Sequence, residues 1–209
     1  MCQGIKVRDA AYDALKRAMI LGAGVAAALA LYLSLTLYVF PQSYQSIGPR
    51  RPEAVVTAVN ISASEIELGQ AFVVSANGVN MGEDADAQIV SIGFPNLTAT
   101  RNIEVIRHDF LQSPQFIIPG EDEVGTEYTG ESLAVAQYPS VEAFSRPWEG
   151  GDAYSIDVQV RPEAEGRFAI FVKSVAFPHS WDGAHWPQEG TVDYQKEFAQ
   201  VHYVTVTKP

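Results

Sequence analysis

Residues 154–161 read YSIDVQVR, and this stretch decides the fold class. Every second residue from Tyr154 to Val160 is apolar, and the residues between them are polar or charged. A period of two puts the apolar side chains on one face of a β-strand and the polar side chains on the other. The stretch therefore predicts a strand with one face buried against a core.

Similar runs lie on both sides of this stretch, and Gly- or Pro-containing turns such as Glu165-Gly166 separate them. About eight short strands with this punctuation are typical of an antiparallel β-sandwich. Because Cys2 is the only cysteine, we expect an immunoglobulin-like (Ig-like) β-sandwich over 54–209 without an inter-sheet disulfide. The other expected strands are Val55–Ile61, Ala71–Val79, Gln88–Phe94, Ile103–Phe110, Ser132–Tyr138, Arg167–Phe177 and Gln200–Thr207.

An uncharged segment, AMILGAGVAAALALYLSLTLYVF at 18–40, precedes the β domain. As a helix, a segment of this length spans about 34 Å, at 1.5 Å per residue. The hydrocarbon core of a bilayer is roughly 30 Å thick. Pro41 ends the helix, and the polar stretch 41–53 reads as a stalk. We therefore expect a single-pass membrane protein with one N-terminal transmembrane helix.

The orientation follows from the cations beside the span. Lys16 and Arg17 come directly before it, within a short basic tail over 1–17, whereas Arg50 and Arg51 lie about ten residues beyond its other end. Cytoplasmic flanks are enriched in Lys and Arg. We expect the N-terminus in the cytoplasm and the β domain on the extracytoplasmic side of the cell membrane.

One short motif indicates an alternative for the N-terminal segment, namely cleavage by a peptidase. Arg17-Ala18-Met19-Ile20 resembles the cleavage signature of archaeal type IV pilin-like precursors, in which a peptidase cuts before the apolar stretch. That resemblance implies a chain processed before Met19 and a filament subunit. The early polar residue usual in such helices is missing, because Ala23 occupies that region.

Charge is unevenly distributed along the chain. Residues 41–209 hold 10 Lys and Arg against 23 Asp and Glu. Such a domain repels phosphate backbones, so nucleic acid is excluded as a partner class. Cations, sugars and other proteins remain as candidate ligands.

The stretch Ser64–Phe94 contains Leu68-Gly69 before an apolar run, then Val79-Asn80 and Gly82, then Ala85 and Ala87 before the next run. This pattern resembles the opening of Ig-like domains of the CARDB type, which occur in prokaryotic cell-surface proteins. The combination of an acidic, disulfide-free domain and an N-terminal anchor also resembles archaeal surface proteins. The resemblance implies a binding or architectural domain at the cell surface, and it supplies no site residues.

The segment Pro178–Pro187, PHSWDGAHWP, holds the strongest candidate site. A loop with His179, Asp182 and His185 could bind a divalent metal ion if the turn at Gly183 brings the two imidazoles together. Alternatively, two tryptophans in this loop could hold it against the sandwich, or they could stack on a sugar or a partner protein. For that binding surface the candidates are Trp148, Trp181 and Trp186.

Two further kinds of candidate are polar. Acidic clusters at Glu83, Asp84 and Asp86, and at 121–127, carry the hard oxygens that calcium prefers, without EF-hand spacing. Two sequons, at Asn60 and Asn96, are glycosylation candidates for an extracytoplasmic domain. Solvated acidic loops and chance sequons are the alternative interpretations.

Catalytic signatures are missing from the sequence: it has no G-x-S-x-G, H-E-x-x-H, P-loop or G-x-G-x-x-G motif. We therefore expect a non-enzymatic, membrane-anchored domain without a cofactor, which binds other envelope or membrane proteins. Two alternatives are open. One is an accessory subunit of a membrane enzyme complex with a metal in the histidine loop, and the other is the pilin-like filament subunit.

Overall fold

The computed structural model describes residues 3–34, 51–97, 100–124, 134–178, 184–194 and 196–209. The chain falls into two compact units, Met1–Ile47 and Gly48–Pro209.

The first unit contains one long helix, α1 (Gln3–Ser34). Its segment Lys16–Leu33 is long and apolar enough to cross a membrane. The large apolar side chains of this segment, from Met19 to Leu33, are half or more exposed, as expected for a surface that meets lipid. The expected end of the span, 35–40, lies outside the described residues.

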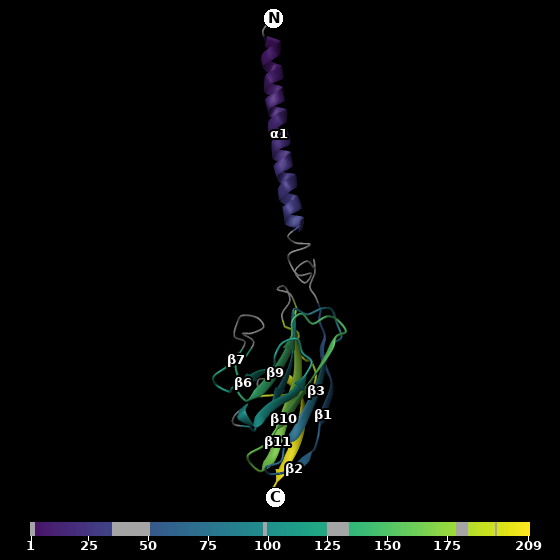
Figure 1. Cartoon of the computed structure of the whole chain (residues 1–209), viewed down its shortest axis with the longest axis vertical. Coiled ribbons are helices and arrows are strands. Elements are labelled where there is room, and N and C mark those ends of the chain that lie inside the picture. The colour runs from purple at the N-terminus through teal and green to yellow at the C-terminus, as the bar shows by residue number, and fades with distance from the viewer. Residues whose placement is uncertain (1–2, 35–50, 98–99, 125–133, 179–183, 195) are drawn as a thin grey trace. The chain divides into compact units, whose positions relative to one another are not determined.

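The second unit is built on two larger sheets, and the all-β expectation is confirmed. The four-stranded sheet has the order β1-β3-β10-β5, and all its pairings are antiparallel. Figure 1 shows β1, β3 and β10 side by side in this layer. Its strands are β1 (Ala54–Ile61), β3 (Phe72–Asn80), β10 (Ala153–Val160) and β5 (Ile103–His108).

The larger sheet has the order β12-β13-β11-β4-β9-β6, and β2 pairs with β13. The β2–β13 pair is parallel, which corrects the expectation of a purely antiparallel sandwich. The members are β2 (Glu65–Glu67), β4 (Ala87–Gly93), β6 (Gln115–Ile117), β9 (Ser140–Ser145), β11 (Gly166–Phe177), β12 (Thr191–Val192) and β13 (Phe198–Thr207). A small hairpin of β7 (Glu123–Val124) and β8 (Ala134–Val135) and the 3-10 helix η3 (Thr100–Asn102) complete the described elements.

The main core lies between these two sheets. Strand β10 directs its predicted apolar face, with Ile156, Val158 and Val160, into this core. The facing sheet contributes Ile170 and Val172 of β11. Two smaller clusters lie on the other side of β11, because its intervening residues, Phe171 and Val175 among them, are buried as well. Strand β11 is therefore covered on both faces, which is unusual for an antiparallel strand.

Candidate binding groove

Trp148 does not belong to an exposed surface, so its prediction as a binding residue is wrong. Its side chain is 0% exposed and packs edge-on against Tyr154, with 4.7 Å between ring centroids. The indole Nε1 donates to the carbonyl oxygen of Asp152 at 2.9 Å. Residue 148 also pairs through its backbone with Ala85, and this pairing draws the segment into the core. Trp148 is a structural residue.

The histidine loop is described only in part, because His179, Trp181 and Asp182 lie outside the described residues. His185 pairs with Ala176 of β11, with His185 N donating to the Ala176 carbonyl at 2.7 Å. Within the described part of the chain, no cluster of three His, Cys, Asp or Glu side chains could hold a metal. Because two of the three predicted ligands are not described, the metal site stays a prediction.

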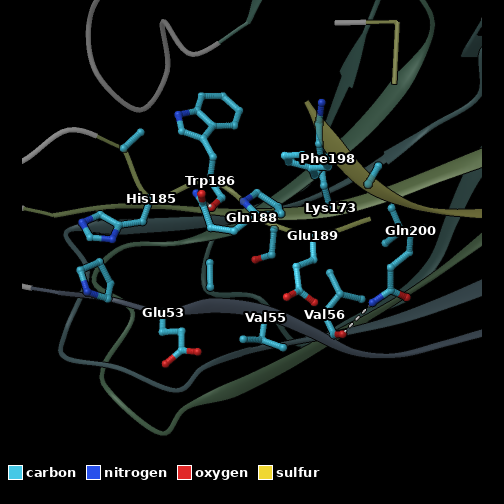
Figure 2. A pocket seen from close by; sticks show the side chains of 17 residues that line it. Glu53, Val55, Val56, Lys173, His185, Trp186, Gln188, Glu189, Phe198 and Gln200 are labelled. Atoms are coloured by element: carbon cyan, nitrogen blue, oxygen red, sulfur yellow. Dashed lines mark hydrogen bonds between the residues drawn. The ribbon is translucent and has the colours of Figure 1, made fainter. Parts of the chain in front are cut away.

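Trp186, the next residue, is half-buried and packs against the outer-face cluster that includes Val175 and Phe177. It also lines an open groove of about 800 Å³. Figure 2 shows Glu53, Val55 and Val56 along one wall of this groove, with His185 and Trp186 along the opposite wall. The groove thus joins the predicted Trp186 to β1, a strand about 130 residues earlier in the sequence.

The groove exists because two segments that pair with the same edge of β11, strand β13 and residues 184–187, end before they meet. The pairing of β13 with β11 ends where Val172 lies opposite Gln200. The segment 184–187 pairs with β11 at Ala176, opposite His185. Between these two points, residues 173–175 of β11 have no paired strand on this side among the described residues.

A proline explains why the pairing of segment 184–187 with β11 goes no further. If its antiparallel register continued by two residues, Pro187 would lie opposite Ser174. Proline has no backbone N–H and cannot donate to a ladder. Both residues line the groove. The backbone edge of β11 at Ser174 is therefore open to the groove.

A second backbone edge belongs to β1, which ends its sheet. Met81 N donates to the carbonyl of Glu53 at 2.8 Å, so Glu53 directs its backbone groups toward the β3 side. Residues in an antiparallel strand direct these groups alternately to the two sides. Val56 agrees with this alternation, since its carbonyl accepts from Gln200 Nε2 on the groove side at 3.0 Å. Ala54 therefore directs its N–H and C=O toward the groove.

The side chains around these edges are apolar and acidic. Phe198 is 37% exposed at one end of the groove, and Trp186 contributes an indole at the other. Two exposed carboxylates, Glu53 and Glu189, also line it. The cation Lys173 lines the groove too, but it lies 8% exposed between two carboxylates. The accessible charge is therefore negative.

Lys173 belongs to a buried polar cluster on the outer face of the larger sheet. Its Nζ lies 2.8 Å from Asp193 Oδ2 and also contacts Glu197 Oε2. Tyr138 OH donates to the same Asp193 oxygen at 2.8 Å. Sequence reasoning missed this cluster. The one available signal was a lysine in the middle of the apolar run RFAIFVKSVAF.

Burial and charge act together on these groups. Burial opposes ionisation of Asp193, but hydrogen bonds from Lys173 and from Glu197 N–H hold the pKa of its carboxyl below the usual value. Burial raises the pKa of Glu197 against the opposing charge of Lys173. Burial, followed by the negative charge of Asp193, raises the pKa of Tyr138 far above its usual value. Tyr138 is consequently a fixed hydroxyl donor.

The other polar candidates have structural contacts. Glu83 Oε2 accepts from Arg51 N at 3.0 Å, and Asp84 Oδ1 accepts from Gly150 N at 3.0 Å. These two carboxylates of the first acidic cluster thus cap backbone N–H groups. Asn60 is exposed on β1, and Asn96 is exposed while its Oδ1 accepts from Ala169 N at 2.8 Å. Glycosylation of either asparagine stays a prediction.

No protein-family model and no curated protein matches this sequence. Among solved structures, the β domain is similar to a cohesin module of a family 33 glycoside hydrolase from Clostridium perfringens, at 8% identity and a TM-score of 0.35, covering 77% of this chain and 99% of that module. A β-glucosidase from Erythrobacter marinus matches at 12% identity and a TM-score of 0.36 over 75% of this chain, and the chain spans 16% of that enzyme. AvmM, which catalyses macrocyclization in alchivemycin A biosynthesis, matches at 10% identity and a TM-score of 0.40, covering 76% of this chain and 89% of AvmM. At these values the similarities assign neither a family nor an activity to the chain.

Proposed function

We propose that the chain is a membrane-anchored, extracytoplasmic binding domain of a cell-envelope or surface complex, and that the groove receives an extended segment of a partner protein. The observation that carries the proposal is the meeting of two open backbone edges, Ala54 of β1 and Ser174 of β11, in one groove. Addition of a strand to an exposed sheet edge is a common mode of peptide recognition. Main-chain hydrogen bonds supply affinity, and pockets for alternate side chains supply specificity.

The chemistry of the walls indicates which segment fits. Glu53 and Glu189 are exposed, and Lys173, the one lysine among the described residues that line the groove, is already paired with carboxylates. A segment with a Lys or Arg beside an apolar or aromatic residue would meet the carboxylates and the surfaces of Trp186 and Phe198. Charge complementarity of this kind favours rapid and specific association.

The expected anchor would strengthen a modest contact. A domain tethered by α1 would share two dimensions with other membrane proteins, and a high effective concentration populates weak complexes. The N-terminus-in orientation rests on Lys16 and Arg17 before the apolar segment. Trp181, in the segment that follows Phe177, stays a candidate for further contact with the partner.

The Ig-like classification is part of this proposal. The order β1-β3-β10-β5 corresponds to strands ABED of such domains, and β13-β11-β4 corresponds to GFC. The order of the strands around β5 differs from that of a variable-type domain. Strand β5 lies in the four-stranded sheet although its chain neighbours β4 and β6 both lie in the other sheet. This correspondence supports the proposal of an Ig-like arrangement for the central strands, and the segment from β5 to β9 departs from it.

Site-specific photo-crosslinking in native membranes tests the groove. A photoreactive amino acid at Phe198 should form an adduct with a partner, whereas the same group at Leu111, which is 58% exposed and does not line the groove, should not. The double variant Glu53→Lys/Glu189→Lys should abolish the Phe198 adduct. As a matched control, Glu65→Lys reverses an exposed charge elsewhere and should preserve it.

The proposal requires that the adduct yields at positions 198 and 111 differ. Equal adducts from positions 198 and 111, or a Phe198 adduct that survives the double charge reversal, would overturn the groove as a specific site for a basic segment. No adduct at Phe198 in membranes that contain the folded, full-length chain would also count against it.

A further inference from the structure

Lys173 and Asp193 come from different parts of the larger sheet, and their side chains meet in a buried environment. Lys173 lies on β11, and Asp193 directly follows β12. Their side chains are 8% and 0% exposed, and Nζ lies 2.8 Å from Oδ2. The two described ion pairs outside this cluster differ in this respect, since Arg101–Glu163 and Arg107–Asp157 each contain an arginine that is more than 70% exposed.

The groups around this pair have the arrangement of an acyl-transfer site. Glu197 Oε2 contacts Lys173 Nζ and can carry a proton to or from it. Two donors point at the carboxyl oxygens of Asp193, with Tyr138 OH at 2.8 Å from Oδ2 and Glu197 N at 3.0 Å from Oδ1. Fixed donors on both oxygens stabilise the charge of a tetrahedral intermediate in a buried site.

We propose that Lys173 and Asp193 form an intramolecular isopeptide bond, with Glu197 as the proton carrier and Tyr138 as an oxyanion donor. The bond would link β11 covalently to the turn between β12 and β13. Lys173 also lines the binding groove proposed above, but this inference does not rest on that function, because the bond needs only the contacts among Lys173, Asp193, Glu197 and Tyr138.

The reaction balances without a cofactor or a redox partner. A proton passes from the Lys173 ammonium to the Asp193 carboxylate, which gives an amine and a carboxylic acid. The lone pair of Nζ attacks Cγ, and the tetrahedral carbon forms the new C–N bond. Glu197 takes a second proton from the nitrogen and delivers it to the departing hydroxyl, so that one Cγ–O bond breaks and one water molecule leaves.

Two features of the environment favour this step. Proximity replaces a bimolecular encounter by an intramolecular one, which contributes greatly to acyl transfer when the amine and the carboxyl group are already in contact, as Nζ and Oδ2 are here. Phe171 and Tyr194 pack edge-on with Tyr138, with ring centroids 5.8 and 6.2 Å from it, beside the polar cluster. Low polarity around the pair lowers the cost of the neutral amine and acid relative to the ions.

Intact mass and tryptic mapping of the purified full-length chain test the proposal. We expect the chain to be lighter by one water molecule than its sequence mass. Trypsin normally cuts after Arg167, Lys173 and Lys196. With an amide at Lys173 it should instead leave a single 168–196 peptide, short of one water molecule. Fragmentation of that peptide should place the bond between residues 173 and 193.

Variants separate the bond from other water losses. Lys173→Arg keeps a cation but has no reactive amine, and Glu197→Gln removes the proton carrier. Both variants should therefore have the full sequence mass. In Glu197→Gln, trypsin should also cleave after Lys173. Lys196→Arg, on an exposed neighbour, should retain the bond. The sequence Asp182-Gly183 can also lose water, but that loss would leave Lys173 cleavable. A wild-type chain of full mass with cleavage at Lys173 would show an ion pair only and overturn the proposal.

Discussion

Gln200 of β13 donates from its side-chain Nε2 to the backbone carbonyl of Val56 in β1, at 3.0 Å (Figure 2). This bond connects the two sheets at the groove and occupies an acceptor on the open edge of β1. A partner strand that added to β1 would need the same acceptor. Gln200 therefore acts as a side-chain substitute for a neighbouring strand.

The first prediction concerns Gln200→Ala. Loss of one exposed hydrogen bond should lower the free energy of unfolding by no more than about 1 kcal/mol. Because the Val56 carbonyl becomes available, the yield of the Phe198 photo-adduct should rise. Urea unfolding of the β domain and the adduct yield in membranes measure the two effects. A lower yield with unchanged stability would mean that Gln200 itself contacts the partner, contrary to its role as a substitute.

The second prediction compares proline at two adjacent positions of β1. Ala54 directs its N–H to the groove, so Ala54→Pro should leave the β1–β3 ladder intact but remove a donor from the open edge. Val55 directs its N–H toward β3, so Val55→Pro should destabilise the domain by roughly 1–3 kcal/mol through an unsatisfied ladder position. Unfolding curves should separate the two variants, and only Ala54→Pro should reduce the adduct at near-native stability. Equal destabilisation would contradict the assigned alternation of the edge.

These positions also indicate how far the sequence could be interpreted. Strand β10 was predictable because its alternation matches one buried and one half-buried face. Strand β9, SVEAFS, was missed since all six of its residues are buried, including Glu142, and no period of two results. The Ser132–Tyr138 strand was expected, but the structure has only Ala134–Val135 there among the described residues.

The candidate site was less predictable than the fold. Trp148 follows Arg146-Pro147 and precedes Glu149-Gly150-Gly151, a composition typical of an exposed turn, yet backbone pairing with Ala85 draws it inward. Only the pairing of distant segments reveals such burial. The groove likewise depends on where β13 ends relative to β11 and β1, and local sequence patterns do not determine that relation.

The third prediction tests the structural role of Trp148 by a substitution at Gly78, which packs against the indole. A Cβ built on Gly78 would collide with the side chain of Val90 and lie 3.2 Å from Cη2 of Trp148. Overpacking of a core typically costs about 1–3 kcal/mol, so Gly78→Ala should lower the unfolding midpoint in urea by a corresponding amount.

Trp186→Ala is the matched comparison for that variant. Because Trp186 is half-buried at the groove, its removal should reduce the photo-adduct more than it reduces stability. Gly78→Ala should show the opposite order at temperatures where it is folded. If both variants lost adduct and stability in the same proportion, the division between a structural Trp148 and a binding Trp186 would be wrong.

The last prediction concerns His202 and pH. Its Nε2 is buried and has no hydrogen-bond partner within the described residues, and burial lowers the pKa of the imidazole from its usual 6.5. The folded chain therefore favours the neutral ring, whereas the unfolded chain takes up a proton as the pH falls through 6.5. Since the unfolded state then binds more protons, stability should decrease as the pH falls below 6.5 toward the lower folded-state pKa. The His202→Gln variant cannot titrate at this position, so its free energy of unfolding should depend less on pH across that window. Urea unfolding of both proteins at a series of pH values measures the difference, and parallel curves would show that His202 does not contribute to the pH dependence.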